Sequence, residues 1–347
     1  MSLLVVMGSG ETAPSLIKVH REIDIATPVH GPAVMLDTTF GFQVNADDLV
    51  ARTSAYFSAS VGLNVELATW RRIDAPQVLR ERTLALLSRA RWAFAGPGSP
   101  TYTLRQWRGT PVPAALAEIT TRGGSLVVGS AAACTLGTHT IPVYEIYKAG
   151  ADPYWDRGLD LLRTLTGLGA VVVPHYDNAE GGRYDTRYCY LGEERLARLE
   201  AELPDDVGVL GVDEHTALLV DLEARAVRVA GSGAVTVRRR GASHSLPAGS
   251  RLALADLDAL LRGEAGAPEG SGGARAGLGP AAGSTGEGAA AADGGSAAAV
   301  PGHGASGPRH PSLRADADAA DLAFEAGLAR GDLEECVRAT LALEEAI

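Results

Sequence analysis

The stretch that decides the fold runs from Leu126 to Ala133 and reads Leu-Val-Val-Gly-Ser-Ala-Ala-Ala. Its apolar start, Leu126-Val127-Val128, is typical of a buried strand, and the small residues that follow let a helix begin at once. We expect this helix to continue through Cys134 and Leu136. A strand that turns this sharply into a helix forms an elbow, a geometry that can present a nucleophilic side chain at its tip.

The residue at the tip of this elbow is predicted from the size of its neighbours. The residues two before and two after the tip must be small, so that the strand and the helix can approach each other. Ala131 meets this condition because its flanking residues are Gly129 and Ala133. For Ser130 one flanking residue is a valine, and for Cys134 one is a leucine. The pattern therefore predicts an elbow whose tip carries no nucleophile.

The first 262 residues alternate strand-like and helix-like segments. Continuous apolar strands separated by amphipathic helices indicate an α/β fold, with a mostly parallel, doubly wound sheet covered by helices on both faces. Helical spacing is clearest around residues 78–87 and 114–119. The predicted strands are Leu3–Met7, Ala33–Leu36, Val65–Ala68, Trp92–Ala95, Ser125–Val128, Ala170–Val173 and Val207–Val212.

Residues 216–239 differ from the parallel part of the chain. Ala217–Val220 and Val227–Val229 are two short apolar runs joined by a turn, and Gly231-Ser232-Gly233 leads into Val235-Thr236-Val237. This spacing is typical of a β-hairpin or meander at one edge of the sheet. Leucines at helical spacing from Leu252 to Leu261 then predict the helix that closes the domain.

The rest of the chain is predicted to form two further segments. Residues 263–311 consist mainly of Gly, Ala, Ser and Pro, which bury too little apolar surface to offset the entropy of ordering, so we expect a disordered linker. Residues 312–347 are expected to form a short helical tail, with Asp332 as an N-cap after Gly331. The predicted domain organisation is thus 1–262, 263–311 and 312–347.

Composition narrows the class of function. The formal net charge is −11 and the isoelectric point about 5.2, which argues against a DNA-binding protein. No apolar run has the length of a membrane span and no signal peptide is recognisable, so we expect a cytoplasmic protein without a membrane partner. The three cysteines are far apart and the histidines show no metal-ligand spacing, so no metal and no cofactor is predicted.

In the order of its motifs the chain resembles the serine peptidase family of cyanophycinase and dipeptidase E, which has the class I glutamine amidotransferase-like fold. The resemblance covers roughly residues 1–240. The matching motifs, besides the elbow, are Gly8-Ser9-Gly10-Glu11, Gly98-Ser99-Pro100, Pro174-His175-Tyr176 with Arg183 and Arg187, and Gly211-Val212-Asp213-Glu214-His215-Thr216-Ala217.

The resemblance implies a role for particular residues. Ala131 stands where the family has its catalytic serine, His175 matches the catalytic histidine and Glu145 matches the acidic member of the triad. We interpret Asp213-Glu214-His215 as a turn rather than as part of the chemistry. The implied oxyanion donors are the backbone N–H groups of Ala132 and of Gly98 or Ser99, and the candidates for the substrate pocket are Gly10, Glu11, Ser130, Arg183 and Arg187.

Three hypotheses about function follow. The leading one is a peptidase-like domain that has lost its nucleophile and binds a peptide-like or acidic small ligand without turnover. The second is an active peptidase or amidohydrolase that uses a water activated by His175, or Ser130 or Cys134 as nucleophile. The third is a platform that binds a protein or RNA through the tail, which weakly resembles the C-terminal extension of cysteinyl-tRNA synthetases. The partners expected are a small-molecule or peptide ligand, a second copy of the chain and a protein bound by the tail.

Overall fold

The computed structural model describes residues 1–264 of the chain. The predicted linker and tail therefore lie outside the described residues, apart from Gly263 and Glu264. No helix within the described part has the length and apolar character needed to cross a lipid bilayer.

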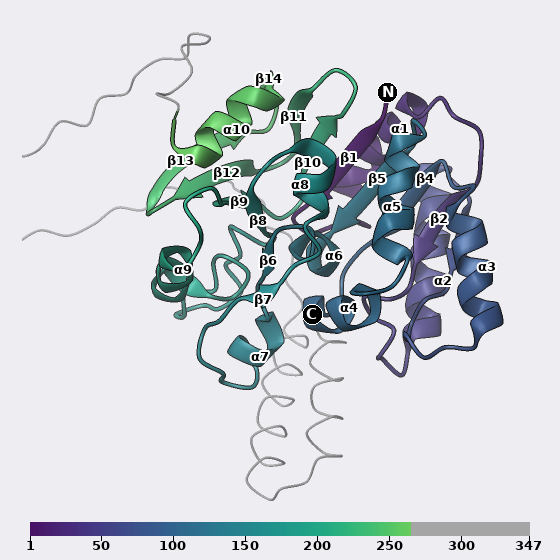
Figure 1. The fold of residues 1–347 in the computed structure, drawn as a ribbon, viewed down its shortest axis with the longest axis horizontal. Helices are drawn as coiled ribbons and strands as arrows, with labels where there is room; N and C mark the ends of the chain where they lie inside the picture. Colours follow the sequence, from purple (N-terminus) through teal and green to yellow (C-terminus); the bar gives the residue numbers. More distant parts are fainter. Residues whose placement is uncertain (265–347) are drawn as a thin grey trace, which may run out of the picture. The chain divides into compact units, whose positions relative to one another are not determined.

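The main element is an eight-stranded mixed sheet (Figure 1). Its parallel part follows the order β1-β5-β4-β2-β3, and an antiparallel extension β10-β11-β14 continues from the other side of β1. The bounds of these strands are β1 (Leu3–Met7), β2 (Ala33–Leu36), β3 (Val65–Ala68), β4 (Trp92–Ala95), β5 (Ser125–Gly129), β10 (Thr216–Asp221), β11 (Ala226–Gly231) and β14 (Arg251–Ala253).

A second sheet of four strands has the order β13-β12-β9-β8. Strands β8 and β9 are parallel to each other, whereas β12 and β13 are antiparallel to their neighbours. A two-stranded ribbon pairs β6 with β7. The bounds are β8 (Ala170–Val173), β9 (Gly208–Val212), β12 (Ala234–Arg239), β13 (Ala242–Pro247), β6 (His139–Thr140) and β7 (Asp156–Arg157).

The helices cover both faces of the main sheet, as a doubly wound fold requires. One face carries α1 and α2, and the other carries α3, α5, α6, α8 and α10. The bounds are α1 (Ile17–Ala26), α2 (Ala46–Tyr56), α3 (Gln77–Leu87), α4 (Pro100–Trp107), α5 (Val112–Thr121), α6 (Ser130–Cys134), α7 (Val143–Tyr147), α8 (Leu161–Thr166), α9 (Gly192–Ala201) and α10 (Leu254–Arg262), with a 3₁₀ turn η1 (Pro14–Leu16) and a π-helical turn η2 (Phe57–Val61).

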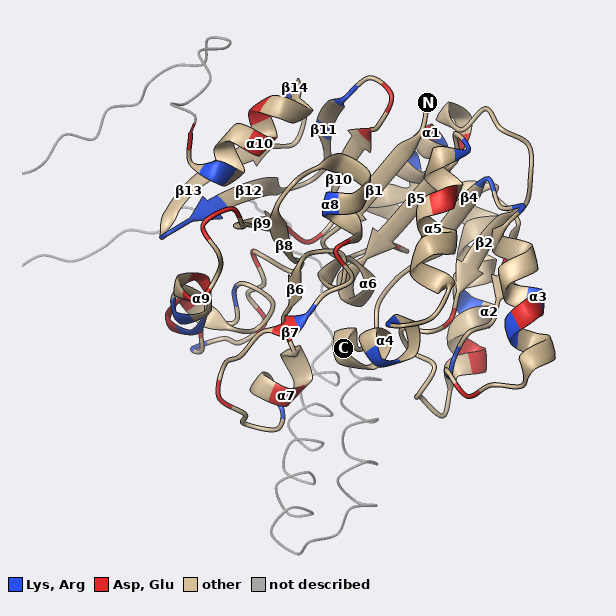
Figure 2. Cartoon of the chain, in the orientation of Figure 1, with Lys and Arg blue, Asp and Glu red and all other residues tan. Residues whose placement is uncertain are grey.

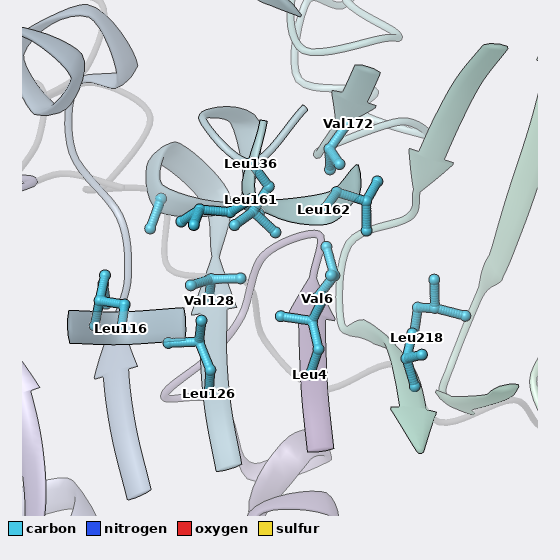
Figure 3. Packing of buried hydrophobic residues seen from close by; sticks show 14 of the residues in the cluster. Leu4, Val6, Leu116, Leu126, Val128, Leu136, Leu161, Leu162, Val172 and Leu218 are labelled. Carbon is cyan, nitrogen blue, oxygen red and sulfur yellow. The ribbon is translucent and has the colours of Figure 1, made fainter. Parts of the chain in front are cut away.

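Alternation along the central strands divides the core into two layers. On β1, Leu4 and Val6 belong to one apolar cluster, whereas Leu3, Val5 and Met7 belong to the cluster on the opposite face. Figure 3 shows side chains of β1 and β5 packed in one layer with Leu136, which follows α6, and with Leu161 and Leu162 of α8. Charged side chains are concentrated on outer helices such as α3 and α9 and on loops, and strands β1, β4 and β5 carry none (Figure 2).

The predicted α/β fold with an antiparallel edge is confirmed, and three details differ. Strands β8 and β9 were expected in the single sheet but pair with each other and with β12 in the second one. The meander divides because β12 turns away after Gly231-Ser232-Gly233 and pairs with β9 instead of β11. The helix after the elbow ends at Cys134, short of Leu136, and Leu252 lies in β14 before α10 begins.

The register of the parallel strands fixes where loops meet. Met7 of β1 is opposite Gly129 of β5, and Val173 of β8 is opposite Gly211 of β9. In open parallel sheets the loops at the carboxyl ends of the strands form the binding crevice. The loops after β1, β4, β5, β8 and β9 are therefore the segments from which a site would be built.

A buried histidine stabilises the loop after β1. His20 is fully buried among Tyr56, Phe57, Trp92 and Phe94, and its Nε2 lies 2.7 Å from the main-chain oxygen of Glu11. Burial lowers the pKa of His20 to about 4, so the ring is neutral at neutral pH and its Nε2–H donates to that oxygen.

We predict that His20 makes the fold sensitive to acid. Its pKa is lowered from 6.5 to about 4 on folding, so as pH falls through this window the unfolded chain takes up a proton that the folded chain does not. The free energy of unfolding should fall by up to about 3 kcal/mol from this group alone. Urea unfolding of the wild type and of His20→Gln at pH 7 and pH 4 measures it. An equal loss of stability in both proteins would contradict the assignment.

Candidate active site

The elbow after β5 is built around Ser130. Ser130 is the first residue of α6 and has a left-handed φ of +45°, whereas Gly129 before it is extended. A non-glycine residue in this region costs about 1–3 kcal/mol and is found where function requires a special backbone geometry. The turn reverses the chain so that the Ser130 hydroxyl stands at the carboxyl edge of the sheet.

Two hydrogen bonds join Ser130 to a histidine and a carboxylate. The Oγ atom of Ser130 lies 2.9 Å from Nε2 of His175, and Nδ1 of His175 lies 2.7 Å from Oε1 of Glu214. His175 follows β8 and Glu214 follows β9, so the three side chains come from the carboxyl ends of three strands. The His175 and Glu214 side chains are 20% and 26% exposed, which leaves them accessible from one side.

The direction of these hydrogen bonds follows from the carboxylate. The hydrogen bond with His175 lowers the pKa of Glu214 despite its burial, so Glu214 is ionised and can only accept. Nδ1 of His175 must then carry the hydrogen that is shared with Glu214. In the neutral ring Nε2 is left with a lone pair, which accepts the hydrogen bond from the Ser130 hydroxyl. This tautomer is the one that a general base requires.

Neighbouring polar groups hold Glu214 in place. Its backbone N–H donates to the carboxylate of Asp177 at 2.7 Å, and the side-chain amide of Asn178 donates to Oε1 at 3.2 Å. Asn178 is fully buried. Because both partners lie just after His175 in the chain, they tie the turn that carries Glu214 to the loop that carries the histidine.

The loop after His175 contains an uncommon run of left-handed backbone. His175 has a φ of +48°, and Tyr188, Cys189 and Tyr190 have φ values of +61°, +57° and +65°. The N–H of Cys189 donates to the His175 carbonyl at 3.1 Å. The ring of Tyr188 packs on Tyr176 with centroids 4.5 Å apart. These contacts stabilise a conformation that L-residues otherwise avoid, and they fix the position of His175.

The residue that the structure brings to His175 is Ser130, one position before Ala131, which was predicted at the tip from its flanking residues. Ser130 is compatible with Val128 two residues earlier because Val128 points into the apolar cluster with Ala132 and Ala133. The close approach occurs at Gly129, where an added Cβ would lie 2.2 Å from Oε1 of Glu11. The need for a small residue therefore falls at Gly129, one position before Ser130.

Glu145 does not contact His175. It lies on α7, and its Oε2 accepts a hydrogen bond from the Thr101 hydroxyl at 2.9 Å. Its role in the structure is to link α7 to the start of α4. The acidic group beside the histidine is Glu214, so the interpretation of Asp213-Glu214-His215 as a turn alone was incomplete. These residues do form a turn, and the turn carries the carboxylate.

Of the oxyanion donors implied by the resemblance, Ala132 with Gly98 or Ser99, only the N–H of Gly98 is without an acceptor among the described residues. The N–H of Ala132 donates to the carbonyl of Gly96 at 3.3 Å, and the N–H of Ser99 donates to that of Thr39 at 2.9 Å. Within residues 1–264, the N–H groups of Ala131 and Gly98 have no acceptor. Since the Ala132–Gly96 bond holds the loop after β4 against the elbow, Ala131 and Gly98 are the better candidates.

The other predicted pocket residues are divided between the site and the surface. Gly10 and Glu11 lie beside the elbow: Gly10 has a φ of +67° and packs against His215. Arg187 is exposed, and Asp185 accepts hydrogen bonds from its Nε and Nη2 at 2.8 and 2.7 Å. Arg183 is exposed and makes no hydrogen bond or ion pair among the described residues.

The buried thiols offer no alternative nucleophile. Burial raises the pKa of Cys134 to about 12 and raises that of Cys189 well above its usual value. Both remain protonated at neutral pH, and a protonated thiol is a poor nucleophile. In the part of the chain that the structure describes, no group of three or more His, Cys, Asp and Glu side chains could hold a metal ion.

A signal for Glu214 was present in the sequence. Residues 170–173 and 208–212 are both apolar strands, and each is followed by a titratable side chain, His175 and Glu214. If the two strands are neighbours and parallel, their carboxyl ends bring these side chains together. What the sequence did not supply was the pairing of β8 with β9.

Comparison with known proteins supports the fold. No family model matches the chain, and no curated protein matches it. Among solved structures, a peptidase from an acI-B1 Actinobacterium is similar with a TM-score of 0.58 and 20% identity, over 73% of this chain and 97% of that one. A provisionally assigned Peptidase E protein from Listeria monocytogenes EGD-e gives 0.43 and 13%, over 69% and 98%. The described domain shares its α/β fold with the acI-B1 peptidase structure.

Proposed function

We propose that the chain is a serine hydrolase of the peptidase type, with Ser130 as nucleophile. The observation that carries the proposal is the continuous relay from Ser130 through His175 to Glu214, with hydrogen bonds of 2.9 and 2.7 Å. A serine hydroxyl is a weak nucleophile unless an adjacent base accepts its proton and a third group orients that base. All three parts are present, and the left-handed turn at Ser130 is the backbone geometry that an elbow nucleophile adopts.

The reaction follows from these roles. Ser130 Oγ attacks the carbonyl carbon of an amide or ester while its proton passes to Nε2 of His175. The Ala131 and Gly98 N–H groups stabilise the negative charge on the carbonyl oxygen. His175 then gives the proton to the leaving group, and an acyl group remains on Ser130. In the second half, His175 takes a proton from water, the hydroxide attacks the acyl carbon, and Ser130 leaves with the proton from His175.

A peptide-like substrate is favoured by the fold shared with the acI-B1 peptidase. The expectation of an acidic ligand has weaker support. Of the two candidate arginines, Arg187 is already neutralised by Asp185, so that Arg183 alone would balance the charge of the ligand. The hypothesis of a lost nucleophile depended on placing Ala131 at the tip of the elbow, so we do not carry it forward. Binding of a protein or RNA by residues 312–347 stays a prediction, since these residues lie outside the described part.

We predict that a fluorophosphonate probe labels the wild type stoichiometrically on Ser130, because its proton can pass to His175 as the bond to phosphorus forms. Ser130→Ala should abolish labelling and lower any hydrolysis roughly a million-fold. The control is Ser130→Ala combined with Ala131→Ser, which we expect to stay unlabelled because residue 131 lies past the turn. Mass spectrometry of the labelled peptide identifies the site. Labelling of the double variant would restore the assignment to position 131.

We further predict that the two candidate carboxylates differ sharply in their effect. Glu214→Gln removes the charge that fixes the His175 tautomer and should slow labelling roughly 10³- to 10⁴-fold. Glu145→Gln should label at the wild-type rate because Glu145 contacts Thr101. The second-order rate constants of labelling at pH 7.5 measure both. A slow Glu145→Gln protein beside an unaffected Glu214→Gln protein would reverse the assignment.

A further inference from the structure

Glu11 is a buried acid for which the proposed reaction has no role. Only 5% of its surface is exposed, and its Oε1 is fully buried without a hydrogen-bond partner. Burial raises its pKa, although its own backbone N–H, His175 and His215 act in the opposite direction. The raised pKa favours the uncharged carboxyl group, which is the form that a buried position without a cation can hold.

This carboxyl group packs directly behind the nucleophile. A Cβ on Gly129 would lie 2.2 Å from Oε1 of Glu11, 2.4 Å from its Cγ and 2.6 Å from its Cδ. The Glu11 side chain thus fills the space next to Gly129 that any other residue would occupy. Since Gly129 immediately precedes Ser130, a movement of the Glu11 side chain would remove a packing contact from the turn at Ser130.

The same loop also contacts the turn that carries the triad acid. The N–H of His215 donates to the carbonyl of Ser9 at 3.2 Å, and a Cβ on Gly10 would lie 2.3 Å from Nδ1 of His215. His215 directly follows Glu214. At its other end the loop is anchored by the hydrogen bond from His20 to the Glu11 carbonyl. The loop therefore lies between the turn at Ser130 and the turn at Glu214, and contacts both.

We propose that Glu11 is a positioning residue for the nucleophile: its carboxyl group, packed on Gly129, holds the turn at Ser130 within hydrogen-bond distance of His175. The inference rests on the proposed function of Ser130. Glu11 takes no proton from the substrate and touches none of the reacting atoms. Its truncation leaves a void beneath Gly129, into which the strained turn at Ser130 can relax.

The first test compares Glu11→Ala with Glu11→Gln by the rate of fluorophosphonate labelling. A nucleophile misplaced by about 1 Å reacts on the order of 100-fold more slowly, so Glu11→Ala should lose roughly 10- to 100-fold. Glu11→Gln has the same shape without charge and should recover most of that loss. Glu66→Ala, on the exposed face of edge strand β3, is the matched control for removal of a glutamate. Circular dichroism and Tm confirm folding.

Three outcomes are informative. Equal rates for Glu11→Ala and wild type would overturn the inference, as would a Glu11→Gln protein as slow as Glu11→Ala, because the charge would then be required. Absence of labelling in the wild type itself would instead overturn the proposed function, and this inference with it.

A second test measures the contact without reference to activity. Gly129→Ala should lower Tm in the wild-type background, because its Cβ meets the Glu11 carboxyl group. In the Glu11→Ala background that carboxyl group is gone, so the same substitution should lower Tm much less. Additive changes in the two backgrounds would show that Glu11 does not support residue 129, and would contradict the inference even if both single variants are poorly reactive.

Discussion

The left-handed turn at Ser130 is the constraint on which the rest of the site depends. It carries a backbone cost of about 1–3 kcal/mol and persists only where surrounding contacts determine it. Three such contacts act together: β5 is paired on both sides by β1 and β4, Gly129 is packed on Glu11, and Ala132 is tied to Gly96. The elbow is stable because these contacts form in the same small volume.

The loop that carries His175 also contains left-handed backbone, and other contacts stabilise it. His175 and residues 188–190 are also left-handed, and here the support comes from packed rings and a buried ion pair. Tyr176 packs on Gly211 and Tyr188, while Arg238, 3% exposed, binds Glu193 and Glu200 beside them. Removing one partner of a buried ion pair is strongly destabilising, because the other charge is left buried without a partner. The loop after His175 is thus held by side chains that lie outside the hydrogen bonds of Ser130, His175 and Glu214.

Much of the fold could be predicted from the sequence, because buried parallel strands are continuous apolar runs. Five of the predicted strands, Leu3–Met7, Ala33–Leu36, Val65–Ala68, Trp92–Ala95 and Ala170–Val173, match the structure in both bounds. Strand pairing could not be predicted. Strands β8 and β9 would have both faces buried in the main sheet as well as in the second sheet, so their apolar content does not select a neighbouring strand. The contact of Glu214 with His175 was not predicted for this reason, since only the pairing of β8 with β9 places the two side chains together.

The tip predicted at Ala131 and the residue found beside His175, Ser130, differ by one position, and this difference has a more general cause. The rule on flanking residues considers only residues two positions away in the sequence. The close approach here comes from Glu11, which lies 118 residues before Gly129. Strand alternation sends Val128 into the apolar cluster on one face, so its size does not hinder the turn. Ser130 can therefore occupy the tip of the elbow, and the small side chains of Ala131 and Ala132 follow it in the first turn of α6. A glycine directly before Ser130, facing a buried acid from the loop after the first strand, is the feature on which the proposed register of the elbow rests.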